Sequence, residues 1–136
     1  MPIVKEVNIQ LENEPGTLAK LCKALAYQKV NILAFQASTA ERKSRLHLVV
    51  DNVSAAKTVL DGERLPYTEA DVAQVPLPDH PGGLARVASL LGQAKINIDY
   101  AYAGEELGTS APQLFLGVAD AGRAAKILDQ FNAAAD

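Results

Sequence analysis

The hydrophobic positions in the first half of the chain follow two periods, which predict alternating strands and helices. Val7, Ile9 and Leu11 alternate with polar residues, and this spacing places all three on one face of a strand. After Pro15 the apolar residues recur at helical spacing instead. The predicted elements follow in chain order: strand 5–11, a helix with the stripe Leu18, Leu21, Cys22 and Leu25, strand 30–37, a strand with Leu46, Leu48 and Val50, a helix with Val53, Ala56, Val59 and Leu60 that ends at Asp61-Gly62, and an extended run from Tyr67. This order, in about 65 residues, is typical of the ferredoxin-like split βαβ unit.

The same pattern occurs a second time along the chain. The segment 15–32 matches the segment 81–98, which lies 66 residues later, and eight of the 18 aligned positions are identical. Chance pairing at ordinary composition gives roughly one identity, so the match indicates a duplication. Further on, 55–57 matches 124–126 at an offset of 69 residues, which predicts three extra residues near 104–110. The helix stripes of the second copy are Leu84, Val87, Ala88 and Leu91, followed by Ala124, Ile127, Leu128 and Phe131.

The second copy differs from the first at its end. After Phe131 only five residues remain, too few and too helix-prone for a fourth strand. The first strand of this copy, at 72–77, is therefore expected to be an open edge, and Pro76 suits an edge because it has no N–H to donate. The segment 68–75 continues from one copy into the next without a linker. We therefore expect an α+β fold of two ferredoxin-like βαββαβ units side by side, domains 1–71 and 72–136, the second lacking its fourth strand.

Composition and charge exclude several classes of protein. The chain has 136 residues, 49% of them hydrophobic, and a formal net charge of −3 without a basic block, so nucleic-acid binding is not expected. A single cysteine excludes an internal disulfide framework and a multi-cysteine zinc site. The beginning of the sequence is charged where a signal peptide is apolar, and no run approaches the ~18 apolar residues of a membrane span. We expect a soluble, cytoplasmic protein without membrane contact.

The turn between the first strand and first helix of each copy carries the candidate chemistry. Proline fixes φ and glycine allows close backbone approach, so Pro15-Gly16 and Pro81-Gly82 can lead tightly into a helix. The helix N-terminus then presents unpaired N–H groups that suit a carboxylate. Asn13 and Asp79 offer either a helix cap or a contact with a ligand ammonium group. A cap alone is the commoner use of such a turn.

These motifs resemble the ACT domain family, in two copies that span nearly the whole chain. The first copy has Leu11-Glu12-Asn13-Glu14-Pro15-Gly16-Thr17-Leu18 with Val30-Asn31-Ile32, and the second has Leu77-Pro78-Asp79-His80-Pro81-Gly82-Gly83-Leu84 with Ile96-Asn97-Ile98. The resemblance is to small bacterial proteins made of two ACT domains, and it implies an amino-acid ligand where two such domains pair. The ligand-binding residues that it implies are Asn13, Glu14, Pro15, Gly16, Thr17, Leu18, Asn31 and Ile32, and Asp79, His80, Pro81, Gly82, Gly83, Leu84, Asn97 and Ile98. Asp79 stands where the family pattern has asparagine, so the two sites need not be equivalent.

The remaining candidates give no catalytic or metal-binding arrangement. His47 and His80 lie in different copies without partners at metal-ligand spacing, and His47 is expected to be an exposed strand residue. Cys22 lies on the apolar helix stripe and is interpreted as a core thiol. Tyr100 and Tyr102 share one strand face, where they either pack on the sheet or line a pocket. No nucleophile has an adjacent base, and Gly82-Gly83 is not a dinucleotide fingerprint.

Two functions remain open on the sequence. The first is a non-enzymatic, cofactor-free sensor that binds an amino acid and regulates a partner, such as an enzyme of amino-acid or organic-acid metabolism. The second is a ligand-free assembly module that regulates a partner enzyme. Asn31 and Asn97 favour the sensor, because an asparagine in an apolar strand-forming run lowers β-propensity unless its amide has a partner. The open edge at 72–77 predicts a homodimer.

Overall fold

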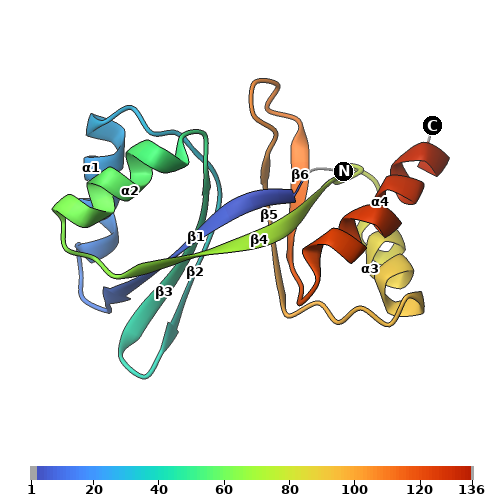
Figure 1. Ribbon diagram of the computed structural model, residues 1–136, viewed down its shortest axis with the longest axis horizontal. Coiled ribbons are helices and arrows are strands. Elements are labelled where there is room, and N and C mark those ends of the chain that lie inside the picture. Colours follow the sequence, from blue (N-terminus) through green and yellow to red (C-terminus); the bar gives the residue numbers. More distant parts are fainter. Residues whose placement is uncertain (1–2, 136) are drawn as a thin grey trace. The chain divides into compact units, whose positions relative to one another are not determined.

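The computed structural model describes residues 3–135 of the protein, with side chains up to residue 130. Its elements, in chain order, are β1 (Ile3–Glu12), α1 (Thr17–Tyr27), β2 (Ile32–Ala40), β3 (Lys43–Val50), α2 (Val53–Gly62), β4 (Tyr67–Pro76), α3 (Gly83–Gln93), β5 (Tyr100–Glu105), β6 (Pro112–Gly117) and α4 (Ala121–Ala135) (Figure 1). They form two compact units. The N-terminal unit holds residues 5–70, and the C-terminal unit holds residues 3–4 and 71–135.

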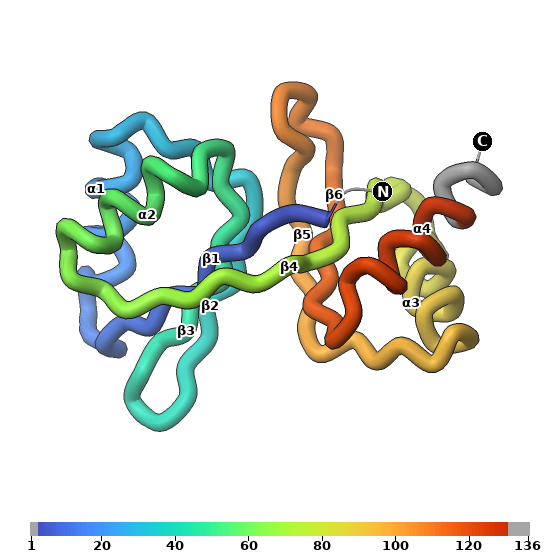
Figure 2. Tube along the Cα trace, in the orientation of Figure 1, coloured from blue at the N-terminus to red at the C-terminus, as the bar shows by residue number. Residues whose placement is uncertain are grey.

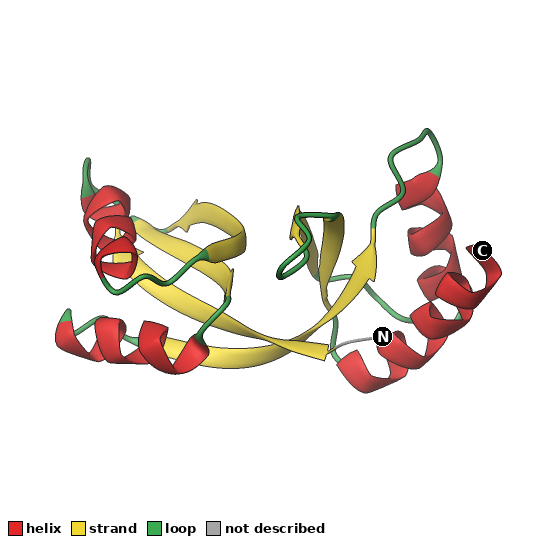
Figure 3. Ribbon diagram, turned by 90° about the horizontal axis from the view of Figure 1, so that it is seen from above, coloured by secondary structure: helices red, strands yellow, loops and turns green. Residues whose placement is uncertain are grey.

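The sheet of the N-terminal unit has the strand order of a split βαβ unit. β3 pairs antiparallel with both β1 and β2. The Gln10 N–H donates to the carbonyl of Pro66, so the chain entering β4 lies beside β1. Helices α1 and α2 cover one face of these strands (Figure 3). The predicted alternation is confirmed, because Val7, Ile9 and Leu11 are buried together in the core under the helices.

The C-terminal unit repeats this arrangement. β6 pairs antiparallel with both β4 and β5, and α3 and α4 cover one face. Its core includes Val75, Leu91, Leu116 and Leu128. The predicted burial of Phe131 lies outside the described side chains. The extra residues of this copy lie where the sequence placed them, because β5 and β6 are joined by 106–111 whereas β2 and β3 are joined by Glu41 and Arg42 alone.

β4 is one continuous strand that serves both copies, as predicted from the lack of a linker (Figure 2). The expectation of an open edge at 72–77 is wrong. Val72, Ala73 and Val75 are fully buried, and the strand order sets β1 beside β4. The beginning of β1 belongs to the C-terminal unit, so the missing fourth strand is not confirmed. The N-terminal strand β1 therefore takes the edge position beside β4 that the pattern of the second copy alone leaves empty.

The helix ends show which residues stop each helix. Lys29 and Lys95 occupy the left-handed region after α1 and α3, with φ of 59° and 64°. Helix α2 ends at Gly62 as predicted, but the left-handed position that terminates it is taken by Arg64 and not by the glycine. There the Leu65 N–H donates to the Leu60 carbonyl at 3.0 Å, which closes a Schellman motif. Packing of Leu65 against the core, rather than the glycine, sets the end of α2. Within the described residues, no helix is long and apolar enough to cross a membrane.

Candidate functional site

The two strand-to-helix turns share a backbone conformation that requires glycine. Gly16 and Gly82 precede α1 and α3 with φ of 89° and 93°, in the left-handed region. The Lys20 and Arg86 N–H groups donate to the carbonyls of Gly16 and Gly82, so the helical bonding pattern starts at these glycines. The N–H groups in the first turn of a helix have no acceptor inside the helix. Among the residues described, neither glycine is joined by a side-chain cap.

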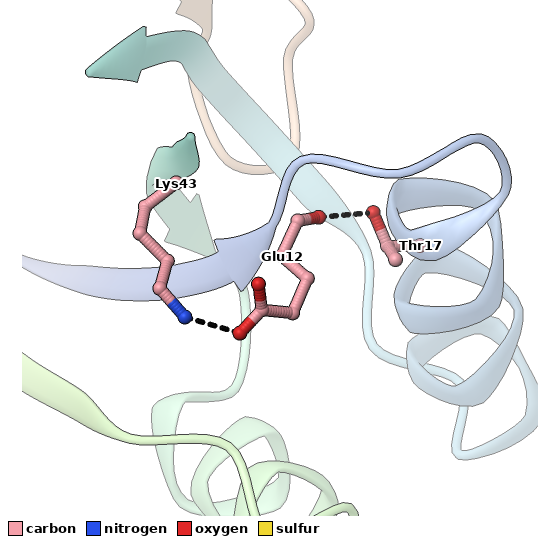
Figure 4. A network of polar contacts seen from close by, with 3 residues as sticks. All are labelled: Glu12, Thr17 and Lys43. Atoms are coloured by element: carbon pink, nitrogen blue, oxygen red, sulfur yellow. Dashed lines mark hydrogen bonds and ion pairs between the residues drawn. The ribbon is translucent and has the colours of Figure 1, made fainter. Parts of the chain in front are cut away.

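Figure 4 shows how the first turn is held. The Thr17 hydroxyl donates to the Glu12 carbonyl at 2.8 Å. It also lies 3.0 Å from the Glu14 carbonyl oxygen. The Glu12 carboxylate forms an ion pair with the Lys43 ammonium group, across the β1–β3 register. The Asn13 N–H donates to the Arg42 carbonyl in the β2–β3 connection. The turn is therefore fixed to the end of the hairpin.

The second turn is held differently. Gly83 is the counterpart of Thr17, and a Cβ on it would lie 2.8 Å from the carbonyl oxygen of Pro78. This approach is possible only for glycine, and it replaces the hydroxyl bond of the first copy. The His80 carbonyl accepts from the Gly83 N–H at 3.2 Å, and His80 Nδ1 lies 3.0 Å from the carbonyl oxygen of Pro81. The two turns are therefore not equivalent.

The capping alternative for the two motif side chains is wrong. Neither Asn13 nor Asp79 caps the helix that follows it, because glycine occupies the N-cap position in both copies. Asn13 Oδ1 lies 3.5 Å from the Ser44 hydroxyl oxygen, at the limit of a hydrogen bond. Both side chains are exposed, as are those of the turn residues Glu14, Pro15, His80 and Pro81. They remain accessible to a ligand.

The asparagine-isoleucine motif that follows the first helix of each copy lies at the start of a strand in the first copy only. Asn31 directly precedes β2, and its N–H donates to Asp51 Oδ1 at 2.9 Å. Asn97 and Ile98 were expected at the start of a strand, but β5 begins only at Tyr100. Tyr100 stands opposite Gly117 and its ring lies over that glycine, where a Cβ would be 2.2 Å from the ring. The absence of a side chain on Gly117 therefore makes room for the Tyr100 ring.

Two leucines predicted on buried helix faces are exposed instead. Leu18 is 40% exposed and Leu84 is 55% exposed, and each lies in the first turn of its helix. Ala88 is also exposed. An apolar side chain therefore lies next to each open helix N-terminus.

A small cavity borders the first of these turns. It has a volume of about 160 Å³ and is lined mainly by Leu11, Thr17, Leu21 and Leu65. The Lys20 and Glu63 side chains also line it, and their charged groups lie 3.9 Å apart. Ligand pockets usually have volumes of roughly 300–1,000 Å³. The cavity is thus too small to enclose an amino acid by itself.

The sequence missed a buried carboxylate in the N-terminal unit. Glu6 is fully buried, and its Oε1 lies 3.1 Å from His47 Nδ1. The expectation that His47 is exposed is therefore wrong, since only 19% of its side chain is accessible. The alternation of β1 places Glu6 on the face opposite Val7, which the sequence shows, but only the strand register of the structure brings His47 to the same face.

The remaining candidates from the sequence are the two tyrosines, Cys22 and groups that could hold a metal ion. Tyr100 stacks on Tyr102 at 6.4 Å and Tyr102 on Phe115 at 5.6 Å between ring centroids, so the tyrosines share a face as predicted. Cys22 is only partly buried, less than a core thiol, and this burial raises the pKa of its thiol. The described residues contain no group of three or more His, Cys, Asp or Glu side chains placed to hold a metal ion.

The fold and its paired turns define two βαββα units, and comparison with known proteins identifies their family. The family model of the ACT domain pair matches residues 2–131, so the chain belongs to the ACT domain pair family. Comparison with curated proteins gives no match.

Solved structures share the fold at low sequence identity. Protein BT0572 from Bacteroides thetaiotaomicron is 22% identical with a TM-score of 0.84, over 96% of this chain and 89% of that one. The ligand-free regulatory subunit of aspartate kinase from Thermus thermophilus is 14% identical with a TM-score of 0.65, over 93% of this chain and 90% of that one. The regulatory subunit of aspartate kinase from Thermus flavus is 17% identical with a TM-score of 0.60, over the same shares.

Proposed function

We propose that this protein is a non-catalytic regulator that binds an amino acid at its strand-to-helix turns. The observation that carries the proposal is the repeated combination of a helix N-terminus without a side-chain cap, a left-handed glycine and an exposed leucine. The N–H groups and the positive end of the helix dipole suit the ligand carboxylate. The exposed leucine can contact an apolar part of the ligand, or of a second domain that covers the turn.

A second ACT domain is needed to complete each site. The turn of the N-terminal unit offers only about 160 Å³ of enclosed space, and its motif side chains are exposed. A ligand bound there alone would keep much of its surface in water. When a second ACT domain covers the turn, the ligand becomes enclosed, and its binding then stabilises one arrangement of domains over another. This coupling is how binding would be transmitted to a partner.

The partner that we propose is an enzyme of amino-acid or organic-acid metabolism. Two of the similar structures are regulatory subunits of aspartate kinase, which supports a regulatory role for this fold. The asymmetry between Thr17 and Gly83 supports different affinities at the two turns.

We propose that the protein is a cytoplasmic homodimer, although the open edge that suggested a dimer does not exist. Sedimentation equilibrium that gives a 14.4 kDa species would contradict the dimer.

The test is a thermal-shift screen with the twenty common amino acids, followed by calorimetry. A ligand at one hundred times its Kd adds about 2.7 kcal/mol to the free energy of unfolding. The variants Gly16→Val and Gly82→Val are expected to abolish binding at the first and second turn respectively, since the new side chain would occupy open space at the turn. Gly108→Val is the matched control, because Gly108 has a φ of 88° and an equally open surround in another loop.

The assembly module remains the second candidate because large apolar side chains are exposed away from the turns. Phe35 is 60% exposed on β2, and Tyr27 is 85% exposed at the end of α1. If no amino acid gives heat or stabilisation, this candidate replaces the sensor. If an amino acid binds and Gly82→Val matches Gly108→Val in affinity, the second turn is not a binding site.

A further inference from the structure

A second cavity lies in the N-terminal unit, on the sheet and away from the turns. It has a volume of about 350 Å³, within the usual range of ligand pockets of roughly 300–1,000 Å³. Its lining residues come from β1, β3 and the chain that enters β4: Asn8, Ile9, Gln10, Arg45, Leu46, His47, Pro66, Tyr67 and Thr68. We call it the sheet-face cavity.

Two cross-strand pairs supply the polar groups of the sheet-face cavity. Asn8 stands opposite His47, and Gln10 stands opposite Arg45. Alternation places these side chains on the face opposite Ile9 and Leu46, which are buried in the core under the helices. A sheet face with two amides, an imidazole and a guanidinium group is unusually polar for a surface that surrounds a cavity.

Two of these groups lack a partner among the residues described. Asn8 Oδ1 is buried and accepts no hydrogen bond. A buried acceptor without a donor costs about 1–3 kcal/mol. The Arg45 side chain lines the same cavity, and within the described part of the chain it forms no ion pair. The cavity therefore has a buried acceptor at Asn8 that needs a donor, and at Arg45 an exposed guanidinium that can bind an anion.

The neighbouring carboxylate fixes which end of the cavity can take the anion. Glu6 is fully buried and contacts His47, which is the cross-strand partner of Asn8. An anion is therefore disfavoured at the Asn8 end and favoured at the Arg45 end. Asn8 and Gln10 are two residues apart on one strand face, which separates the two ends by roughly 7 Å.

We propose that the sheet-face cavity is a second binding site, for a small carboxylic acid whose hydrogen-bond donor lies at the opposite end of the molecule. The carboxylate binds the Arg45 guanidinium, which matches its planar shape, and the distal donor binds Asn8 Oδ1. An α-amino acid bound by its amino and carboxylate groups alone is too short for this spacing. The site is therefore distinct in ligand and in place from the turns.

The test uses three acids with one carbon skeleton: butanoate, 4-hydroxybutanoate and 4-aminobutanoate. Each is titrated, up to about 10 mM, into the ¹⁵N-labelled full chain, and amide shifts are followed. We expect the two acids with a distal donor to shift the amides of Asn8, Arg45 and Thr68, with affinity at least about tenfold above that of butanoate. The amides of Leu18 and Leu84 at the turns are expected to stay unchanged.

Two variants separate recognition from folding. Asn8→Leu keeps the branched shape and is expected to lower the affinity of both acids to that of butanoate, while the free energy of unfolding is unchanged or raised, because the unpartnered acceptor is removed. Arg45→Gln is expected to weaken all three acids, whereas the matched charge change Arg42→Gln, in the connection beside it, is expected to have no effect.

Several outcomes would overturn this site. It is refuted if none of the acids binds, if butanoate binds as well as the other two, or if Asn8→Leu lowers stability and leaves affinity intact. None of these results bears on the turns, whose test uses α-amino acids and the glycine variants.

Discussion

The Thr17 hydroxyl donates to the carbonyl of Glu12 at 2.8 Å and so closes the first turn across the start of α1. Thr17→Val removes the hydroxyl and keeps the shape. We expect it to lower the free energy of unfolding by about 0.5–1.5 kcal/mol, the usual net contribution of one hydrogen bond. Urea denaturation measures this loss. Thr58→Val is the control, because the Thr58 hydroxyl bonds only to Ser54 on an exposed helix turn, and an equal loss there would contradict the role of Thr17.

Gly83 and Gly92, at the two ends of α3, are expected to respond to alanine in opposite directions. A Cβ on Gly83 would lie 2.8 Å from the backbone oxygen of Pro78, so Gly83→Ala must shift the turn. We expect a loss of about 1–3 kcal/mol, as for other overpacked sites. Gly92 lies in the helix with open space around it, so Gly92→Ala is expected to stabilise by up to about 1 kcal/mol. Thermal denaturation of both variants measures the difference, and a stabilising Gly83→Ala would contradict it.

Gln74 and Gln113 form a buried pair in the C-terminal unit, with Gln74 Nε2 donating to Gln113 Oε1 at 3.0 Å. Gln74→Leu leaves the Gln113 amide buried without this partner, and we expect a cost of about 1–3 kcal/mol. The double variant Gln74→Leu/Gln113→Leu removes both polar groups and is expected to recover most of that loss. A double-mutant cycle in urea measures the coupling. Strictly additive losses would show that the pair has no mutual interaction.

Cys22 is expected to react slowly with thiol reagents in the native state, because burial raises the pKa of its thiol and the thiolate is the reactive form. The rate of reaction with an aromatic disulfide, compared with that in denaturant, measures the protection.

The raised native pKa of Cys22 also means that the thiol contributes stability at low pH, which is lost as the pH rises through that pKa. Cys22→Ala is expected to reduce the alkaline decline in stability. An unchanged decline, or equal rates in native and unfolded protein, would contradict this.

The sequence by itself determined the duplication, the order of elements and most of the core positions. Period-two alternation in β1 and helical spacing in α1 depend on local geometry, so Val7 and Leu25 could be assigned to a buried face without knowing their contacts. The turn glycines were equally predictable, because a left-handed φ selects glycine at Gly16 and Gly82. These features are properties of short segments.

Tertiary structure decided the features that depend on residues distant in sequence. The N-terminal strand occupies the edge predicted to be open because long-range pairing, not the pattern of one copy, selects a strand's neighbour. β5 starts at Tyr100 rather than at Asn97, and the Tyr100 ring lies over Gly117 of the neighbouring strand, a contact between residues distant in sequence. The Glu6–His47 pair and the cavity beside it arise only from the register that aligns β1 with β3, since neither residue carries a local signal of its partner. Local periodicity fixes which face a side chain takes, but only the folded sheet fixes what it meets there.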